Sequence, residues 1–255
     1  MPHTPLRRWL AALAVIATLL ASINLRDLAQ WLGYPIPPLP IAFGGALLDN
    51  GLGVVLVVLV AALLLRDARP LHRALGLQWN GWQGPALALL ATVPCWLGLW
   101  WLGGVQPNPD LVALLMLGVL FPLAEEIVFR GFGFIFVHRQ QRWPWLAAVL
   151  VQALIFGGIH WWSFGGGGGM ALQVLAITAI GGIVFAWLNT LDGYTLWSGL
   201  ALHVSLNLAW NVFVISDATA VGWPGTTLRL SAAGLAVGLL WLLHRRRRLP
   251  DATAG

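Results

Sequence analysis

The stretch Glu125-Glu126-Ile127-Val128-Phe129-Arg130 lies inside an apolar run that extends from Leu111 to Val137. Three ionisable side chains in six residues are costly where lipid is the solvent. One charge at the centre of a spanning helix costs about 2.5–3.5 kcal/mol on insertion scales. A sequence tolerates this cost mainly for a functional site or for a tightly paired structural cluster. The run therefore predicts a membrane helix with a candidate site at its centre.

The composition of the whole chain supports a membrane protein. Hydrophobic residues make up 59% of the 255 positions and charged residues only 9%, whereas soluble domains carry roughly 25% charged residues. All fourteen basic residues are Arg. They flank apolar runs in short loops, where they determine topology, so the net charge of +5 does not indicate a nucleic-acid partner. Cys95 is the single cysteine, which excludes a disulfide framework and a cysteine-based metal site.

Apolar runs of about 20 residues predict an all-α polytopic fold with about eight transmembrane helices. The second run carries Asp49 and Asn50 in its first half, which leaves its start open. We divide the chain into N-terminal spans without a motif (1–110), a catalytic core (111–215), and a last span with a basic tail (216–255). The predicted spans are Trp9–Leu25, Ile41–Leu65, Trp82–Gly103, Leu111–Val137, Trp145–Trp162, Met170–Asn189, Tyr194–Ile215 and Thr227–His244.

The distribution of arginine predicts the orientation in the membrane. If the N-terminus lies in the cytoplasm, eleven of the fourteen arginines fall on the cytoplasmic side, which places both termini there. The first run follows Arg7-Arg8 and lacks a convincing small-residue cleavage site, so a retained span is favoured over a signal peptide. The Arg-, Ala- and Trp-rich composition favours a bacterial inner membrane. The cytoplasmic arginines are Arg7, Arg8, Arg66, Arg69, Arg73, Arg139, Arg142, Arg245, Arg246, Arg247 and Arg248.

The spacing within the charged stretch suggests different roles for its two glutamates. Residues four apart share a helix face, so Glu126 and Arg130 can pair and offset much of each other's burial cost. Glu125 points about 100° away from Glu126 in a 3.6-residue helix. We interpret Glu126–Arg130 as a structural pair and Glu125 as the base that moves protons. The alternative is that all three residues form one buried ion cluster.

Polar side chains in two other predicted spans are candidate partners of Glu125. His160 ends the run Phe156-Gly157-Gly158-Ile159-His160, and His203 and Asn207 lie four residues apart in a later span, with Asn211 one turn further. A rise of 1.5 Å per residue puts Glu125, His160 and His203 about 20, 24 and 15 Å deep. We therefore expect these groups to converge on a cavity between the fourth, fifth and seventh spans.

Such a group of side chains can hydrolyse a peptide bond without a covalent nucleophile. A carboxylate and an imidazole can deprotonate water and protonate the leaving amine. An imidazole and an amide can donate hydrogen bonds to the tetrahedral oxyanion. As an alternative, Glu125, His160 and His203 supply the O and N ligands that zinc accepts. We expect no cofactor, because the compact His-Glu-x-x-His spacing is absent, and we keep zinc as the alternative.

Three motifs resemble the CAAX protease and bacteriocin-processing (CPBP, or Abi) family of intramembrane proteases. They are Glu125-Glu126-x-x-x-Arg130, Phe156-x-x-x-His160 and His203-x-x-x-Asn207, in this order. The resemblance implies that Glu125 and His160 activate water and that His203 and Asn207 stabilise the oxyanion. It also implies supporting roles for Glu126, Arg130 and Phe156, and a membrane-associated or lipidated peptide as substrate.

Two other classes of protein remain alternatives. A proton-coupled transporter also uses buried Glu and His chains, but it predicts repeats in both halves of the chain, and the polar groups cluster in the second half. A non-catalytic membrane scaffold or immunity protein would not need every motif position filled. The motifs leave the substrate open between prenylated CAAX proteins, bacteriocin leaders and C-terminal sorting signals. They also leave the metal dependence and the oligomeric state open.

Overall fold

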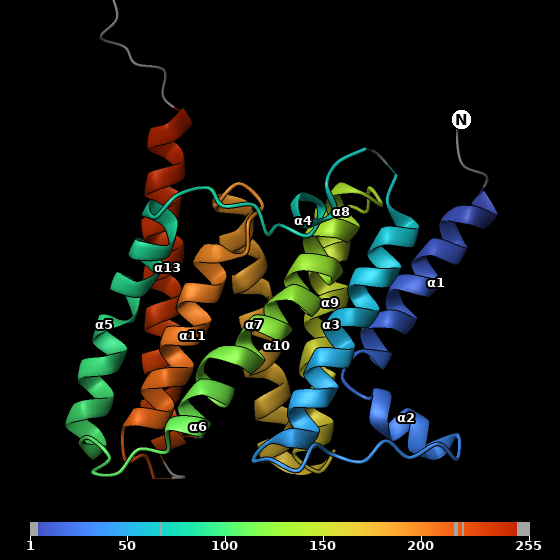
Figure 1. Ribbon diagram of the computed structural model, residues 1–255. Coiled ribbons are helices and arrows are strands. Elements are labelled where there is room, and N and C mark those ends of the chain that lie inside the picture. The colour runs from blue at the N-terminus through green and yellow to red at the C-terminus, as the bar shows by residue number, and fades with distance from the viewer. Residues whose placement is uncertain (1–4, 67, 217–218, 221, 249–255) are drawn as a thin grey trace, which may run out of the picture. The chain divides into compact units, whose positions relative to one another are not determined.

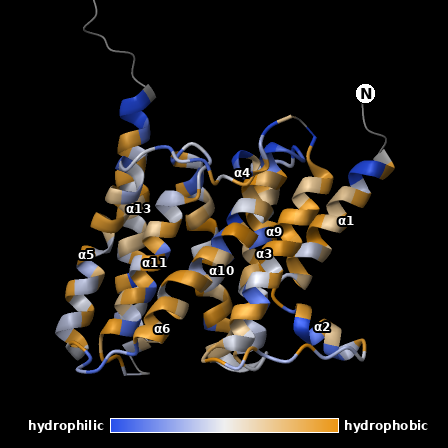
Figure 2. Ribbon diagram, viewed as in Figure 1, coloured by the Kyte–Doolittle hydropathy of each residue, from blue (hydrophilic) through white to orange (hydrophobic). Residues whose placement is uncertain are grey.

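The computed structural model describes residues 5–66, 68–216, 219–220 and 222–248, and these residues form helices and turns without a strand (Figure 1). Within these described ranges, six helices are long and apolar enough to cross a membrane. They are Gly44–Leu64, Gln83–Gly103, Leu111–Arg139, Trp145–Ser163, Gly168–Leu191 and Trp223–Arg247. In Figure 2 hydrophobic and intermediate colours dominate the long helices, and the hydrophilic colour lies mainly at helix ends and loops. The chain is an all-α integral membrane protein.

The other two predicted spans correspond to shorter helices. The first becomes α1 (Pro5–Ala21) followed by α2 (Leu25–Trp31), and their axes differ by 91°. The bent pair counts as a seventh span if it is taken as one. The seventh predicted span becomes α11 (Trp197–Val212), which has only 16 residues. The expected total of eight spans therefore stays a prediction.

Contacts divide the chain into two compact units. The first contains Met1–Gln78 and Leu123–Ile183, and the second contains Trp79–Pro122 and Val184–Gly255. The division of the chain into three parts was drawn from motifs and stays a prediction.

In the first unit, α1 packs on α3 (Gly44–Leu64), and the π-helix η2 (Glu126–Phe136) packs on α3 and on α9 (Trp145–Ser163). The short helices α4 (Leu71–Ala74) and α8 (Val137–Arg139) also contact η2. The first part of α10 (Gly168–Leu191) belongs to this unit too. Four phenylalanines of η2 are completely or almost completely buried and fill its core: Phe129, Phe132, Phe134 and Phe136.

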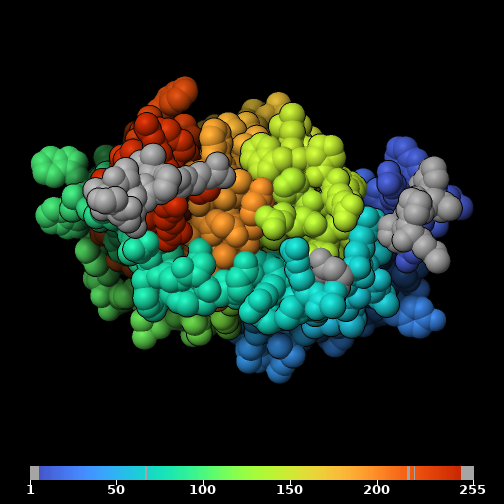
Figure 3. Space-filling model, turned by 90° about the horizontal axis from the view of Figure 1, so that it is seen from above, coloured from blue at the N-terminus to red at the C-terminus, as the bar shows by residue number. Residues whose placement is uncertain are grey.

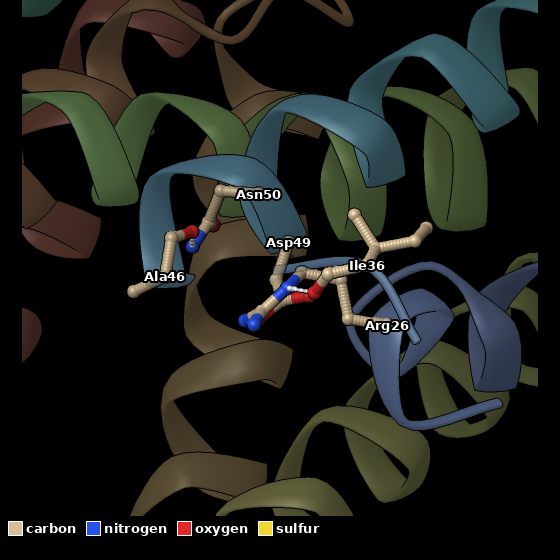
Figure 4. A network of polar contacts seen from close by, with 5 residues as sticks. All are labelled: Arg26, Ile36, Ala46, Asp49 and Asn50. Carbon is tan, nitrogen blue, oxygen red and sulfur yellow. Dashed lines mark hydrogen bonds and ion pairs between the residues drawn. The ribbon is translucent and has the colours of Figure 1, made fainter. Parts of the chain in front are cut away.

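An ion pair joins the corner between α1 and α2 to the start of α3 (Figure 4). Arg26 Nη1 lies 3.2 Å from Asp49 Oδ2, and Arg26 Nε donates a hydrogen bond to the Ile36 carbonyl at 3.1 Å. Asn50 donates to the Ala46 carbonyl within α3 at 2.9 Å. The start of the second span, which the sequence left open, is therefore Gly44, and its two polar residues lie in the first two turns.

Arginines gather at one end of the first unit. The pKa of Arg66 is lowered, first by burial and then by the positive charges of Arg142, Arg8 and Arg7. These four residues come from the end of α3, the loop before α9 and the start of α1. Arg69 and Arg73 are exposed and belong to the segment after α3, which lies on the surface in Figure 3. The ends of these elements form one basic surface, as membrane-flanking arginines predict.

In the second unit, α5 (Gln83–Gly103) packs on α11 and on α13 (Trp223–Arg248). Residues spaced three or four apart on α5 make one buried face, which meets buried small residues of α13. Small side chains let membrane helices approach closely. The residues of this contact are Ala88, Ala91, Cys95, Leu99, Ala232, Ala236 and Leu240.

Candidate functional site

The charged stretch lies where the helix changes its hydrogen-bond pattern. Glu125 is the last residue of α7 (Phe121–Glu125), and Glu126 begins the eleven-residue π-helix η2. A second π-helix, η1 (Met116–Leu120), precedes α7, and α6 (Leu111–Leu115) precedes η1. π-Helical turns are rare and occur frequently at functional sites. The apolar run itself did not predict them.

Glu126 and Arg130 form the pair that their spacing predicts. Arg130 Nε lies 3.6 Å from Glu126 Oε1, and both side chains have no exposed surface. Their mutual attraction offsets part of the cost of removing two charges from water, and the loss of either partner would leave an uncompensated buried charge. Glu125 is half-buried and therefore more accessible than Glu126.

Phe156 links this pair to His160. The Arg130 guanidinium lies over the Phe156 ring at 4.3 Å from the centroid, a cation–π contact. The centroids of the Phe156 ring and the His160 imidazole are 4.4 Å apart. Phe129 packs edge-on against Phe156 at 4.9 Å. A continuous array of contacts thus runs from Glu126 through Arg130 and Phe156 to His160.

A backbone hydrogen bond determines the tautomer of His160. Nδ1 lies 2.8 Å from the Phe156 carbonyl oxygen. A carbonyl can only accept, so Nδ1 carries the hydrogen, and Nε2 of the neutral ring keeps its lone pair. The side chain is half-buried. His160 is therefore held with one basic nitrogen, the form that a general base or a metal ligand requires.

His203 and Asn207 belong to the second unit. His203 is 9% exposed and stacks on Phe185, with ring centroids 5.0 Å apart and an interplanar angle of 22°. Asn207 Nδ2 donates to the Leu117 carbonyl at 3.0 Å. Asn211 Nδ2 donates to the Asn207 carbonyl at 2.8 Å, which extends the polar face as expected.

Ser205 lies between His203 and Asn207 in the chain, on the side of α11 opposite to them. Its hydroxyl connects this side of α11 to α5 by hydrogen bonds. The Thr92 hydroxyl donates to the Leu89 carbonyl at 2.7 Å, so Ser205 donates its own proton to Thr92 Oγ1 at 2.7 Å. Ser205 Oγ in turn accepts from Trp96 Nε1 at 2.9 Å. Sequence reasoning missed this contact, although Ser205 stands out as a hydroxyl inside the third motif. The motif-free helix α5 therefore positions the helix that carries His203 and Asn207.

The predicted site residues thus fall into two groups. Five of them are in the first unit and are connected by side-chain contacts or adjacent in the chain: Glu125, Glu126, Arg130, Phe156 and His160. His203 and Asn207 are in the second unit. The expected cavity that all of them share stays a prediction.

Zinc is the alternative to a site without a metal. Within the described ranges, no three His, Cys, Asp or Glu side chains form a group that could hold a metal ion. The donor types of Glu125 and His160 nevertheless fit zinc, and Nε2 of His160 is the nitrogen that would bind it. Metal dependence therefore stays open.

The fold and the buried ionisable array define a polytopic membrane protein with a motif-bearing central segment. Residues 107–209 match the model of the family described as type II CAAX prenyl endopeptidase Rce1-like. This segment includes all three motifs, so the match confirms the predicted resemblance to CPBP proteases and points to a hydrolase of the protease class. Neither a curated protein nor a solved structure matches the chain.

Proposed function

We propose that the protein is an intramembrane endopeptidase that hydrolyses a peptide bond of a membrane-associated or lipidated substrate. The family match over 107–209 and the spanning helices support this activity. The single observation that carries the mechanism is the hydrogen bond from His160 Nδ1 to the Phe156 carbonyl, because it leaves Nε2 basic. This hydrolysis proceeds by direct attack of water, without a covalent enzyme intermediate.

Glu125 and His160 activate the attacking water in this mechanism. A proton leaves the water as its oxygen attacks the substrate carbonyl, and the same pair of groups later protonates the leaving amine. Glu125 is half-buried and directly precedes the buried Glu126, which anchors the segment through Arg130. Phe156, which lies under the Arg130 guanidinium, packs against the His160 ring and holds it from one side.

His203 and Asn207 stabilise the oxyanion of the tetrahedral intermediate. An asparagine amide has two N–H groups, and one of those of Asn207 is engaged by the Leu117 carbonyl. The other is the group that we assign to the substrate. Removal of one such donor lowers kcat by about 10²–10³ in a well-studied protease.

The orientation that we propose has both termini in the cytoplasm of a bacterial inner membrane. The support is the basic surface around Arg66, which brings the start of α1 and two loops together in the first unit. Arginines of short loops remain preferentially on the cytoplasmic side. The proposed partners are the lipid bilayer and a membrane-associated peptide substrate, and no nucleic acid is among them.

Purified protein in proteoliposomes tests the activity against prenylated CAAX peptides, leader peptides and C-terminal sorting peptides. The parent should cleave one class, and Glu125→Gln and His160→Ala should each lower the rate by about 10²–10⁴, the range for general acid–base groups. Exposed Trp101→Phe is a matched control that should cleave at the parent rate. Variants that cleave as fast as the parent would exclude the proposed mechanism.

Zinc is the alternative that the same tautomer of His160 supports. In that version, zinc would polarise the substrate carbonyl and activate the water. Thorough chelation followed by dialysis separates the two versions. Full activity after chelation supports the glutamate mechanism, and loss that zinc restores supports the metalloprotease.

A further inference from the structure

The second unit contains a proline whose position explains an unusual contact of Asn207. Pro122 lies in the middle of the helix Leu111–Arg139 and is buried. Proline has no N–H, so it cannot donate to a carbonyl one turn earlier. A helix interior with such a gap must bend, bulge or find another donor.

The gap falls on the Leu117 carbonyl. Phe121 N–H, which would serve Leu117 in an α-helix, donates to the Met116 carbonyl, five residues earlier. In this wider register the donor for Leu117 would be the N–H of residue 122, which is proline. Neither the α-helical nor the π-helical hydrogen-bond register therefore gives the Leu117 carbonyl a backbone donor. A buried carbonyl without a donor costs about 1–3 kcal/mol.

Asn207 supplies the missing donor. Its Nδ2 lies 3.0 Å from the Leu117 oxygen. Gly118 allows the two helices to approach closely enough for this hydrogen bond. A Cβ at position 118 would lie 2.5 Å from Leu208 Cδ2 and 3.7 Å from the Leu208 Cα. η1 and α11 thus approach closely beside Asn207, as small residues allow.

We propose that Pro122 is a positioning residue that orients the Asn207 amide through the Leu117 carbonyl. The bond fixes which end of the amide faces Leu117, since only nitrogen can donate to a carbonyl. It also restricts the orientation of the amide, and with it the direction of the second N–H. This inference rests on the proposed function, in which that N–H binds the oxyanion.

Pro122→Ala restores a backbone N–H at position 122, which competes with Asn207 Nδ2 for the Leu117 carbonyl oxygen. We expect kcat to fall about tenfold, corresponding to roughly 1.4 kcal/mol, with KM and thermal stability close to those of the parent. Pro94→Ala is the matched control, because Pro94 is an intrahelical proline of the same unit without a contact to Asn207 in the described hydrogen bonds. It should leave kcat unchanged.

A double-mutant cycle shows whether Pro122 acts through Asn207. Asn207→Ala should lower kcat strongly, and Pro122→Ala in that background should cause no further loss. If the two losses multiply, Pro122 has a general structural role and the inference is wrong.

The side-chain amide signal of Asn207 gives a readout that does not need activity. In protein labelled with ¹⁵N-asparagine and assigned through Asn207→Asp, the signal should shift in Pro122→Ala and stay in place in Pro94→Ala. An unchanged signal in Pro122→Ala would overturn the inference. If the parent cleaves no substrate while the signal shifts as expected, the proposed function fails and the orientation of Asn207 by Pro122 stands.

Discussion

At the scale of the residue, Glu126 and Arg130 form a fully buried ion pair in the segment that carries Glu125. Cation–π and ring contacts extend from Arg130 through Phe156 to His160, and they depend on how η2 packs on α9. Phe156 was identified only through the family motif, yet its ring lies between Arg130 and His160. The tautomer of His160 likewise depends on the folded structure, in which Nδ1 faces the Phe156 carbonyl.

The buried pair predicts a sharp contrast between single and double variants. Glu126→Gln or Arg130→Met alone should destabilise the protein by about 3–5 kcal/mol, because each leaves one uncompensated buried charge. The double variant should be clearly more stable than either single variant. Unfolding in detergent, followed by circular dichroism, measures the difference. A double variant destabilised by the sum of the two single effects would contradict a mutually compensating pair.

At the scale of the element, the apolar runs predicted where the helices lie but not their internal geometry. The helix Leu111–Arg139 contains two π-helical segments, because hydrogen-bond register depends on local gaps such as Pro122 and not on hydropathy. The glycine run Gly165–Gly169 separates the predicted fifth and sixth spans. Its last two residues, Gly168 and Gly169, belong to α10.

Gly157 and Gly158, which the sequence could not distinguish, have different surroundings. A Cβ at Gly157 would lie 2.9 Å from the Leu175 carbonyl oxygen and 3.1 Å from Ala179 Cβ on α10. A Cβ at Gly158 would meet nothing within 4 Å. Gly157 therefore permits close packing of two helices, whereas the backbone at Gly158 faces open space.

The matched variants Gly157→Ala and Gly158→Ala test this distinction. Gly157→Ala should destabilise the protein by about 1–3 kcal/mol through overpacking, and should reduce activity because His160 is one turn away. Gly158→Ala should be as stable as the parent or more stable by up to about 1 kcal/mol, since alanine favours helix. Thermal unfolding in detergent gives both values. Equal stability of the two variants would contradict the proposed packing role.

At the scale of the whole molecule, composition and the length of the apolar runs together predicted the all-α membrane class. Runs of about 20 apolar residues fit spanning helices, which satisfy their backbone hydrogen bonds within one segment in lipid. The number of spans was less predictable, because α1 bends by 91° into α2 and α11 has only 16 residues. A site shared by all three motifs stays a prediction, because spacing within one helix does not encode tertiary packing.

Cysteine labelling tests the proposed orientation. With both termini in the cytoplasm, the segment between the predicted fifth and sixth spans lies on the outer side. In a Cys95→Ala background, Gly167→Cys in this segment should react with a membrane-impermeant maleimide in intact cells, because position 167 has open space around it. Arg246→Cys, in the exposed C-terminal end of α13, should react only after the membrane is opened. The reverse pattern would contradict cytoplasmic termini.

The central claim is that Glu125 and His160 direct a water molecule at a peptide bond. Cleavage in ¹⁸O-water under single-turnover conditions, followed by mass spectrometry of the products, tests it most directly. The parent should place one ¹⁸O in the new carboxylate, and folded Glu125→Gln should form this product at least about 100 times more slowly. Equal product formation by Glu125→Gln, or a product without ¹⁸O, would contradict the claim.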